Sequence, residues 1–337
     1  MSWSSFVDVP VDSLAHRVLR SEMIASLSTG RWAKSMSLAP PVSTLVQSLW
    51  RPELPQLVDQ EQLLLALPWA RVNRVEGSLL RRYPVLLPSG LAAVEANNES
   101  FRSNLAGAAT VLRAAGVDVL LVKTDLSRDF EYSNFDLVVG DDGWSRALIA
   151  LRPWGNHTTR YWLEHSKLIF YPPTGPGAHL HRNLNWFDIP LFNTQRLRDR
   201  SLPGPTEALR IPGPSDEVRS LLAHALFQNL TLDFADLLRL REILTPGVTA
   251  DAQVEASQEG WAAGFRGSMQ LVHQAIQTLD AGGSIPLPLP LPIVLSVQGG
   301  LEHARHLAGV RRLGKAAREV VLRGPLVGRR LVWGRAC

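Results

Sequence analysis

The sequence predicts an α+β protein in which a small mixed sheet lies between two helical regions. Three observations support this prediction. Phe101, Leu105 and Leu112 recur at helical spacing in a long amphipathic pattern that leads directly into an apolar, β-branched run, Val117–Val122. A second apolar run begins at Asn134, and more strand-like runs follow it closely. Helical periodicity then returns in the last third of the chain, which places the sheet in the middle.

Composition sets bounds on the class of protein. The chain has 337 residues, 45% of them hydrophobic and 20% charged, so it is long enough to bury a substantial core. A single cysteine, Cys337, excludes a disulfide framework and a cysteine-based metal site. We find no charged-then-apolar leader, and the longest apolar run, 285–297, carries four prolines and is too short to span a bilayer. We therefore expect a cytoplasmic protein without a membrane partner.

Residues 1–88 are predicted to form an N-terminal helical region. Helical patterns cover 11–28, 43–50 and 56–67, and prolines interrupt the chain between them. The strongest helix follows, with Ser89 expected as its N-cap and Gly116 as the left-handed residue that ends it.

Residues 89–200 are predicted to hold the sheet. After the strand that starts near Asn134, the sequence Gly140-Asp-Asp-Gly143 predicts a turn, and a short helix is expected over 144–151. Further strands are then predicted, and they cover 160–165, 167–171 and 179–186.

Residues 201–337 are predicted to form a C-terminal helical region. Ser215 is the expected cap of a helix over 216–228, and further helices are predicted over 233–244, 255–279 and about 300–322. Alternating prolines in 284–292 remove helix hydrogen bonds, so this segment is interpreted as an extended strap. The basic end of the chain is interpreted as a solvated helix face, and no nucleic-acid partner is expected.

Three short motifs, taken in order, resemble a known family. They read Val122-Lys-Thr124, Asn134-Phe-Asp-Leu137 and His179-Leu-His-Arg182. Their order and spacing, over about residues 90–245, resemble the bacterial uncharacterised nucleotidyltransferase family of the polymerase-β-like superfamily. The resemblance implies a nucleotidyltransferase core that uses Mg²⁺ and an NTP. In such a site an Asp-x-Asp pair on one strand and a carboxylate from a neighbouring strand hold the metal ions.

The sequence departs from this family at the residues that hold metal. Thr124 stands where the family has Gly, Asn134 where it has the first metal carboxylate, and His179 where the third is aligned. Asparagine is neutral and histidine is a poor Mg²⁺ ligand, so one carboxylate, Asp136, remains of about three. The metal set for ordinary nucleotidyl transfer is therefore incomplete.

Asp136, His179 and His181 are the candidate catalytic residues. The two histidines lie two positions apart on one strand and therefore share a face. With Asp136 they form either a two-His-one-carboxylate site for a transition metal or an acid/base group. The competing interpretation is a pair of partly exposed strand histidines that bind nothing, next to an aspartate that merely begins a strand.

Other polar residues are candidates for binding the substrate. These are Lys123, Thr124, Asn134 and Arg128. Lys123 either binds a phosphate or carboxylate as a point charge or is a solvated strand end. The loop acids Asp125, Asp129 and Glu131 either supply a displaced carboxylate or are solvated. His224, on an apolar helix face, is interpreted as a core histidine, with a functional role as the alternative.

Three functions are compatible with these residues. The first is a nucleotidyltransferase-like protein with an altered metal set, which modifies a small molecule or a peptide in a biosynthetic pathway. The second is the same fold used for acid/base chemistry without metal or NTP, through Asp136 and the histidines. The third is a non-catalytic binding protein.

Overall fold

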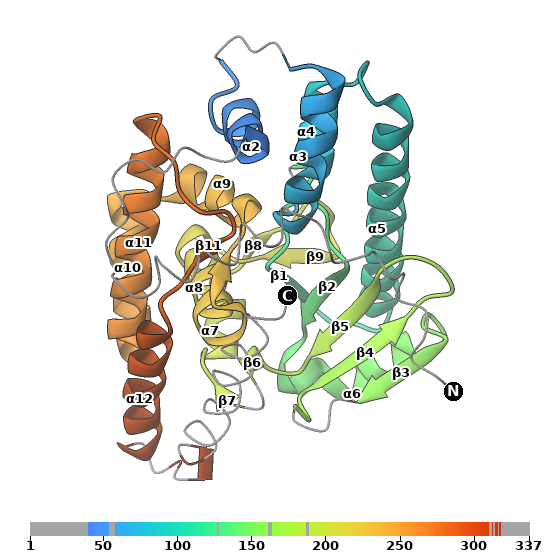
Figure 1. Ribbon diagram of the computed structural model, residues 1–337. Coiled ribbons are helices and arrows are strands. Elements are labelled where there is room, and N and C mark those ends of the chain that lie inside the picture. The colour runs from blue at the N-terminus through green and yellow to red at the C-terminus, as the bar shows by residue number, and fades with distance from the viewer. Residues whose placement is uncertain are drawn as a thin grey trace.

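A computed structural model describes residues 40–53, 58–126, 128–160, 164–186 and 189–309, and the single positions 312, 314, 315 and 317. It confirms the α+β class, because a mixed sheet lies among helices that come from both ends of the described chain (Figure 1). The helix predicted over 11–28 lies outside the described residues, as does most of the predicted basic helix beyond residue 309. No helix in the described part of the chain is both long enough and apolar enough to cross a membrane.

In the described part of the chain, four helices precede the sheet. They are α2 (Pro40–Trp50), α3 (Gln60–Val72), α4 (Glu76–Arg82) and α5 (Pro88–Ala114). In α3 the Asp59 carboxylate accepts the amide of Gln62, whose side chain accepts the Asp59 amide in return. This capping box fixes where α3 begins. Helix α5 begins at Pro88, one residue before the predicted cap Ser89, because proline is well suited to the first turn. Gly116, with φ +66°, follows its end as predicted.

The central sheet has seven strands in the order β3-β4-β5-β2-β1-β9-β8. Their bounds are β1 (Val119–Val122), β2 (Asn134–Val138), β3 (His157–Arg160), β4 (Lys167–Tyr171), β5 (Gly177–His181), β8 (Leu202–Pro203) and β9 (Leu209–Ile211). Strand β2 pairs antiparallel with β1 and parallel with β5, and β1 pairs parallel with β9. The sheet therefore continues to Ile211, beyond the predicted core boundary at residue 200.

Three local predictions around the sheet were wrong. Strand β3 begins at His157, so the predicted 160–165 strand was placed too late. The predicted turn at Gly140–Gly143 is instead the first turn of helix α6 (Gly140–Leu151), where Asp141 and Asp142 suit the positive end of the helix dipole. The predicted strand at 179–186 is divided into β5 and a separate short strand, β6 (Asn185–Trp186).

The two faces of the sheet bury different cores. Leu121, Phe135 and Leu137 pack in one cluster with residues of α5 and α6. Leu120 and Val138 belong to a second cluster, which also contains residues of the N-terminal and C-terminal helices. Because successive strand side chains point to opposite faces, Asp136 lies on the same face as Val138. The fold thus turns Asp136 toward the C-terminal helices.

The last third of the described chain is mainly helical. Its helices are α7 (Thr194–Asp199), α8 (Pro214–His224), the π-helical turn η1 (Ala225–Asn229), α9 (Phe234–Ile243), α10 (Pro246–Gln258), α11 (Ala262–Asp280) and α12 (Ile293–Gly309). Its short strands are β7 (Ile189–Pro190), β10 (Thr231–Leu232) and β11 (Leu289–Pro290). Helix α8 begins one residue before the predicted cap Ser215, again with proline in its first turn.

The proline-rich strap is extended, as predicted. It connects α11 to α12 (Figure 1), and its strand β11 pairs with β10. The alternate residues Ile285, Leu287, Leu289 and Leu291 are all buried. An extended chain with an apolar residue at every second position can therefore pack these side chains into the helical core without forming a helix.

Gly77 in α4 lies where no side chain fits. An added Cβ would lie 2.8 Å from Glu131 Oε1 and 2.9 Å from both the Asp129 carbonyl oxygen and a Val94 methyl group. We expect Gly77→Ala to lower the free energy of unfolding by about 1–3 kcal/mol, because the crowded backbone has to shift. Urea unfolding measures this. In the control, Gly247→Ala, the nearest atom is 3.9 Å away, and a change within about 0.5 kcal/mol is expected. Equal changes in both variants would contradict the steric argument.

Glu131 is predicted to make stability depend on pH. Its carboxylate accepts the amides of Glu76 and Gly77, and burial raises its pKa from 4.5 to about 7. Between these two pH values the folded state holds a proton that the unfolded state has released, so stability falls as pH rises. The full difference is on the order of 3 kcal/mol. Urea unfolding at pH 4.5 and pH 8 should therefore show a larger loss for the wild type than for Glu131→Gln. Parallel losses in the two proteins would contradict this prediction.

Candidate active site

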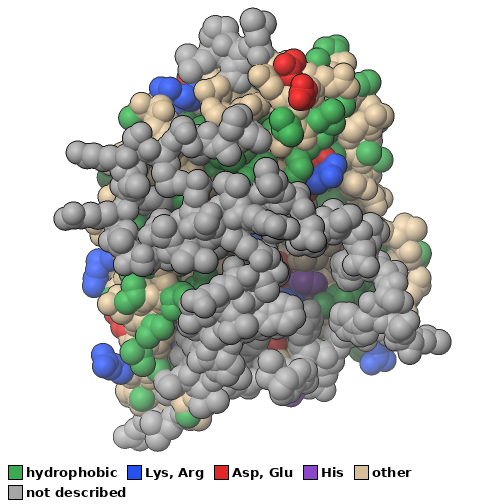
Figure 2. Space-filling model, viewed as in Figure 1, with side chains coloured by type: hydrophobic (Ala, Val, Ile, Leu, Met, Phe, Trp, Pro, Cys, Tyr) green, Lys and Arg blue, Asp and Glu red, His purple; other side chains and the backbone are tan. Residues whose placement is uncertain are grey.

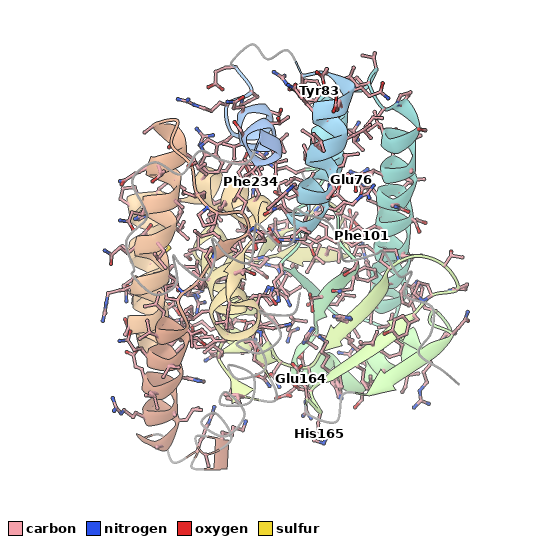
Figure 3. All side chains as sticks on the ribbon, in the orientation of Figure 1. Glu76, Tyr83, Phe101, Glu164, His165 and Phe234 are labelled. Carbon is pink, nitrogen blue, oxygen red and sulfur yellow. The ribbon has the colours of Figure 1, made fainter. Side chains whose placement is uncertain are left out.

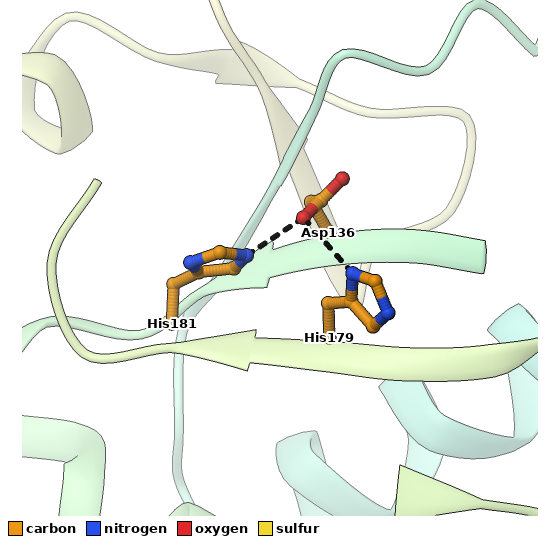
Figure 4. Close-up of side chains that lie close together, drawn as sticks. All are labelled: Asp136, His179 and His181. Carbon is orange, nitrogen blue, oxygen red and sulfur yellow. Dashed lines mark hydrogen bonds and ion pairs between the residues drawn. The ribbon is translucent and has the colours of Figure 1, made fainter. Parts of the chain in front are cut away.

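Strands β2 and β5 bring Asp136, His179 and His181 together. In the parallel pairing of these strands, Asp136 is opposite His179, and Val138 is opposite His181. Residues opposite each other share a face, and residues two apart on a strand do so as well. All three side chains therefore point to one side of the sheet. Figure 4 shows both imidazole rings beside the Asp136 carboxylate.

The Asp136 carboxylate has polar partners on both oxygens. Its Oδ1 lies 2.7 Å from His181 Nε2 and 3.5 Å from His179 Nδ1, and its Oδ2 lies 3.0 Å from Lys123 Nζ. The group is largely buried, but its two histidines are buried to different extents. The His181 side chain is 3% exposed and that of His179 is 16% exposed. His179 is thus the histidine that is more accessible to a substrate. A histidine is visible near the middle of the face drawn in Figure 2.

Lys123 reaches Asp136 from an unusual backbone conformation. It follows the end of β1 and has φ +60°, in the left-handed region. For a residue other than glycine this conformation costs roughly 1–2 kcal/mol, and such outliers cluster at functional sites. Thr124, the next residue, donates its hydroxyl hydrogen bond to the Val122 carbonyl at 3.3 Å. The sequence pointed to Lys123 as a strand end, but not to this strained turn.

Sequence reasoning missed Lys167 and Glu164. Lys167 is opposite His181 in the antiparallel β4–β5 pair, which puts it on the face that carries Asp136. Glu164 lies just before β4 (Figure 3), and its Oε1 is 4.0 Å from His181 Nδ1. The chain has only four lysines, so a lysine in a strand next to the histidine strand was a signal that could have identified Lys167.

The charges at this site are fixed by burial and by neighbours. Burial alone would raise the pKa of Asp136, but the Lys123 charge and hydrogen bonds from both histidines hold it well below its usual value. Burial lowers the pKa of His179, and it lowers that of His181 to about 4. Burial also lowers the pKa of Lys167. An ionised carboxylate therefore lies between two neutral imidazoles at neutral pH.

His224 approaches the same site from helix α8. Burial holds its pKa well below the usual value, and the next largest cause is the positive charge of Lys123. The charges of Asp136 and Lys167 also act on it. His224 is therefore near the site electrostatically, although the sequence interpretation treated it as a core residue.

The remaining predicted residues have other partners. The Asn134 amide donates to Ser133 Oγ at 3.1 Å, and its position on β2 gives it the same face as Asp136. Arg128 forms an ion pair with Glu242 of α9 and lies over the Phe130 ring, 5.7 Å from its centroid. The described contacts thus place Asn134 beside the candidate site, whereas Arg128 forms its ion pair with α9.

The loop acids also have partners of their own. Asp129 forms an ion pair with Arg81 at 2.5 Å, and Arg239 Nε lies 3.7 Å from Asp125 Oδ2. Glu131 binds the first amides of α4. The described contacts therefore give these three acids structural roles, and none of them is a contact with Asp136.

The comparisons with known proteins give no match: neither a family model, nor a curated protein, nor a solved structure matches this chain. The site is therefore interpreted from its own geometry. Among the described residues, the group with the spacing of metal ligands is Asp136, His179 and His181, with one donor atom from each within 4.8 Å of the others. It contains a single carboxylate, so these residues do not fit the Mg²⁺ ions that the family resemblance implies.

Proposed function

We propose that the protein is an enzyme with a nucleotidyltransferase-like fold that performs acid/base chemistry on a small polar molecule or peptide, without Mg²⁺ or NTP. The observation that carries this proposal is the Asp136–His179 pair. His179 Nδ1 faces the carboxylate, while the other ring nitrogen, Nε2, points away from it (Figure 4). A carboxylate behind a partly exposed histidine is an arrangement that orients a general base.

The proposed base works through its tautomer. His179 Nδ1 lies 3.5 Å from Asp136 Oδ1, and the carboxylate favours the tautomer that carries its proton on Nδ1, which leaves the lone pair on Nε2. Nε2 takes a proton from the substrate, and the ionised Asp136 stabilises the imidazolium that forms. Lys123 and Lys167 add positive charge on the same side of the sheet. Positive charge there favours the anion that is left when the substrate loses its proton.

His181 has a positioning role in this proposal. Its side chain is 3% exposed and donates to the same carboxylate oxygen at 2.7 Å. A second donor holds the Asp136 carboxylate in one orientation, and that orientation in turn fixes the His179 ring. His181, a catalytic candidate from the sequence, thus acts through Asp136 in this proposal and not on the substrate directly.

The arrangement of strands supports the nucleotidyltransferase-like fold. A long helix leads into β1, which ends next to Lys123; β2 carries Asp136, and α6 follows. Strand β5, with its two histidines, is the immediate neighbour of β2, where the family resemblance places the third carboxylate. Histidines in that position support chemistry different from two-metal transfer.

A turnover screen tests the proposed function. Protein stripped of metal with EDTA is incubated with a library of small polar metabolites and short peptides, and products are followed by mass spectrometry. We expect turnover that persists in EDTA and consumes no nucleotide. Release of pyrophosphate from an NTP with Mg²⁺ would overturn the proposal in favour of nucleotidyl transfer. Saturable binding of a library member without turnover would favour the non-catalytic alternative.

Asn134→Asp separates the two enzymatic alternatives. It restores the first carboxylate of the family motif on the face of β2 that carries Asp136. Both histidines remain beside the two carboxylates of the variant, and imidazoles are poor ligands for Mg²⁺. We therefore expect Mg²⁺ and ATP to leave the melting temperature of the variant unchanged, as in the wild type. A rise in melting temperature with Mg²⁺-ATP in the variant alone would indicate a modified nucleotidyltransferase instead.

A further inference from the structure

The geometry of Asp136, His179 and His181 points to a second property of this group, and we infer that it binds one divalent transition-metal ion. One donor atom from each side chain lies within 4.8 Å of the other two. The distances from Asp136 Oδ1 to the two histidine nitrogens are 2.7 Å and 3.5 Å. Metal–ligand bonds of about 2.0–2.2 Å place neighbouring donors roughly 3 Å apart. An ion fits between these atoms with small movements of the side chains.

The donor set selects the kind of ion. Two imidazoles and one carboxylate suit Zn²⁺, Fe²⁺ or Co²⁺, whereas Mg²⁺ prefers oxygen ligands alone. Three donors on one face leave the remaining coordination positions to water or a substrate. The site is also rigid, because both histidines belong to β5 and Asp136 belongs to the strand paired with it.

Partners behind the ligands match those of a metal site. Lys123 Nζ is 3.0 Å from Asp136 Oδ2, so Oδ1 remains for the ion. The buried His181 Nδ1 has no hydrogen-bond partner within the described structure, and Glu164 Oε1 lies 4.0 Å from it. A histidine that binds metal through one nitrogen commonly directs the other toward a carboxylate, which fixes its tautomer. Glu164 is placed for this role toward His181.

Metal binding would prevent His179 from acting as the proposed base. With its Nδ1 lone pair on the ion, a neutral His179 carries its proton on Nε2, where it cannot accept another. His181 undergoes the corresponding change, because its proton moves from Nε2 to Nδ1, which faces Glu164. The two rings change tautomer with no net release of protons. This consequence for turnover rests on the proposed function, whereas the binding of the ion does not.

Metal titration of the full chain tests the binding. Protein stripped with EDTA is titrated with Zn²⁺ by calorimetry and with Co²⁺ by visible absorption. We expect one ion per chain, and binding at least about 100-fold weaker in His179→Ala, His179→Gln and Asp136→Ala, since even the loss of an outer partner costs 10–100-fold. His273→Ala is the matched control, because His273 is exposed on α11. It should bind like the wild type.

The outcomes separate the two proposals. No binding by the wild type, or equal binding by all the variants, would overturn the metal site and leave the base proposal standing. His179→Gln guards against misfolding, because it keeps a polar side chain of similar length at the more exposed ligand. If the ion binds, added Zn²⁺ should abolish the turnover found in EDTA, and renewed chelation should restore it. If Zn²⁺ binds but turnover is unchanged, the claim that the ion inhibits His179 is wrong, whereas the metal site itself stands.

Discussion

Replacing Asp136 with asparagine is expected to lower turnover by roughly 10²–10⁴-fold while leaving the fold intact. The substitution preserves shape, but an amide has one accepting oxygen and one donating nitrogen. In the wild type both carboxylate oxygens accept, one from the two histidines and the other from Lys123. The amide cannot satisfy both sides of the site.

The expected loss follows from the tautomer of His179. If the amide oxygen turns to the Lys123 ammonium, the amide nitrogen donates toward His179 Nδ1. The ring must then accept at Nδ1 and carry its proton on Nε2, and it is no longer a base. If the amide turns the other way, two donors face each other at Lys123. Either amide orientation disrupts the contacts among Lys123, residue 136 and the histidines, and the first orientation also prevents His179 from acting as a base.

The measurement compares turnover of Asp136→Asn with that of the wild type and of His273→Ala at saturating substrate. A circular dichroism melt confirms that each variant is folded. Turnover within threefold of the wild type in folded Asp136→Asn would reject His179 as a base oriented by Asp136. The control should stay at the wild-type level, since His273 is exposed on α11.

The largest loss of stability is expected at Arg219. Its side chain is 1% exposed and forms ion pairs with Asp216 and Glu259, and its guanidinium lies over the Phe192 ring, 4.8 Å from the centroid. Arg219→Met keeps much of the apolar contact but removes the charge. Asp216 retains an ion pair with Arg200 at 2.6 Å, whereas Glu259 loses its closest cation. We expect a loss of about 3–5 kcal/mol, the usual result when one partner of a buried pair is removed.

Arg113→Met is the matched control for this prediction. Arg113 pairs with Glu207 at 2.7 Å, but the two side chains are 56% and 82% exposed. Exposed pairs contribute about 0–1 kcal/mol, so the control should change little. Urea unfolding of both variants measures the difference. A loss at Arg219 no larger than that at Arg113 would show that burial does not decide the strength of these pairs.

Local patterns predicted the parts of the fold that depend on nearby residues. The spacing of Phe101, Leu105 and Leu112 gave the long helix α5, and the two apolar runs gave β1 and β2. The shared face of His179 and His181 followed from the two-residue period of a strand. Those inferences needed no knowledge of distant contacts.

The remaining features depend on pairings that no local pattern encodes. Lys167 and Glu164 join the site through the β4–β5 register and the turn before β4. Strand β9 lies next to β1, although about ninety residues separate them in sequence. The ion pair of Arg128 with α9 likewise required the packing of the C-terminal helices. The sequence indicated Arg128 as a candidate for binding the substrate, but it could not indicate Glu242 as its partner.

The shared core on the Asp136 face of the sheet bears on how the chain unfolds. Val42 of α2, Val122 of β1 and Leu291 of the strap belong to one buried cluster. Within the described residues, the helical regions before and after the sheet therefore contribute to the same buried cluster. Loss of either region exposes the apolar face of the other and of the sheet, which couples their stabilities in a single cooperative unit. A cleavage near residue 200 would accordingly leave two fragments that each lack part of their core and need the other to regain structure.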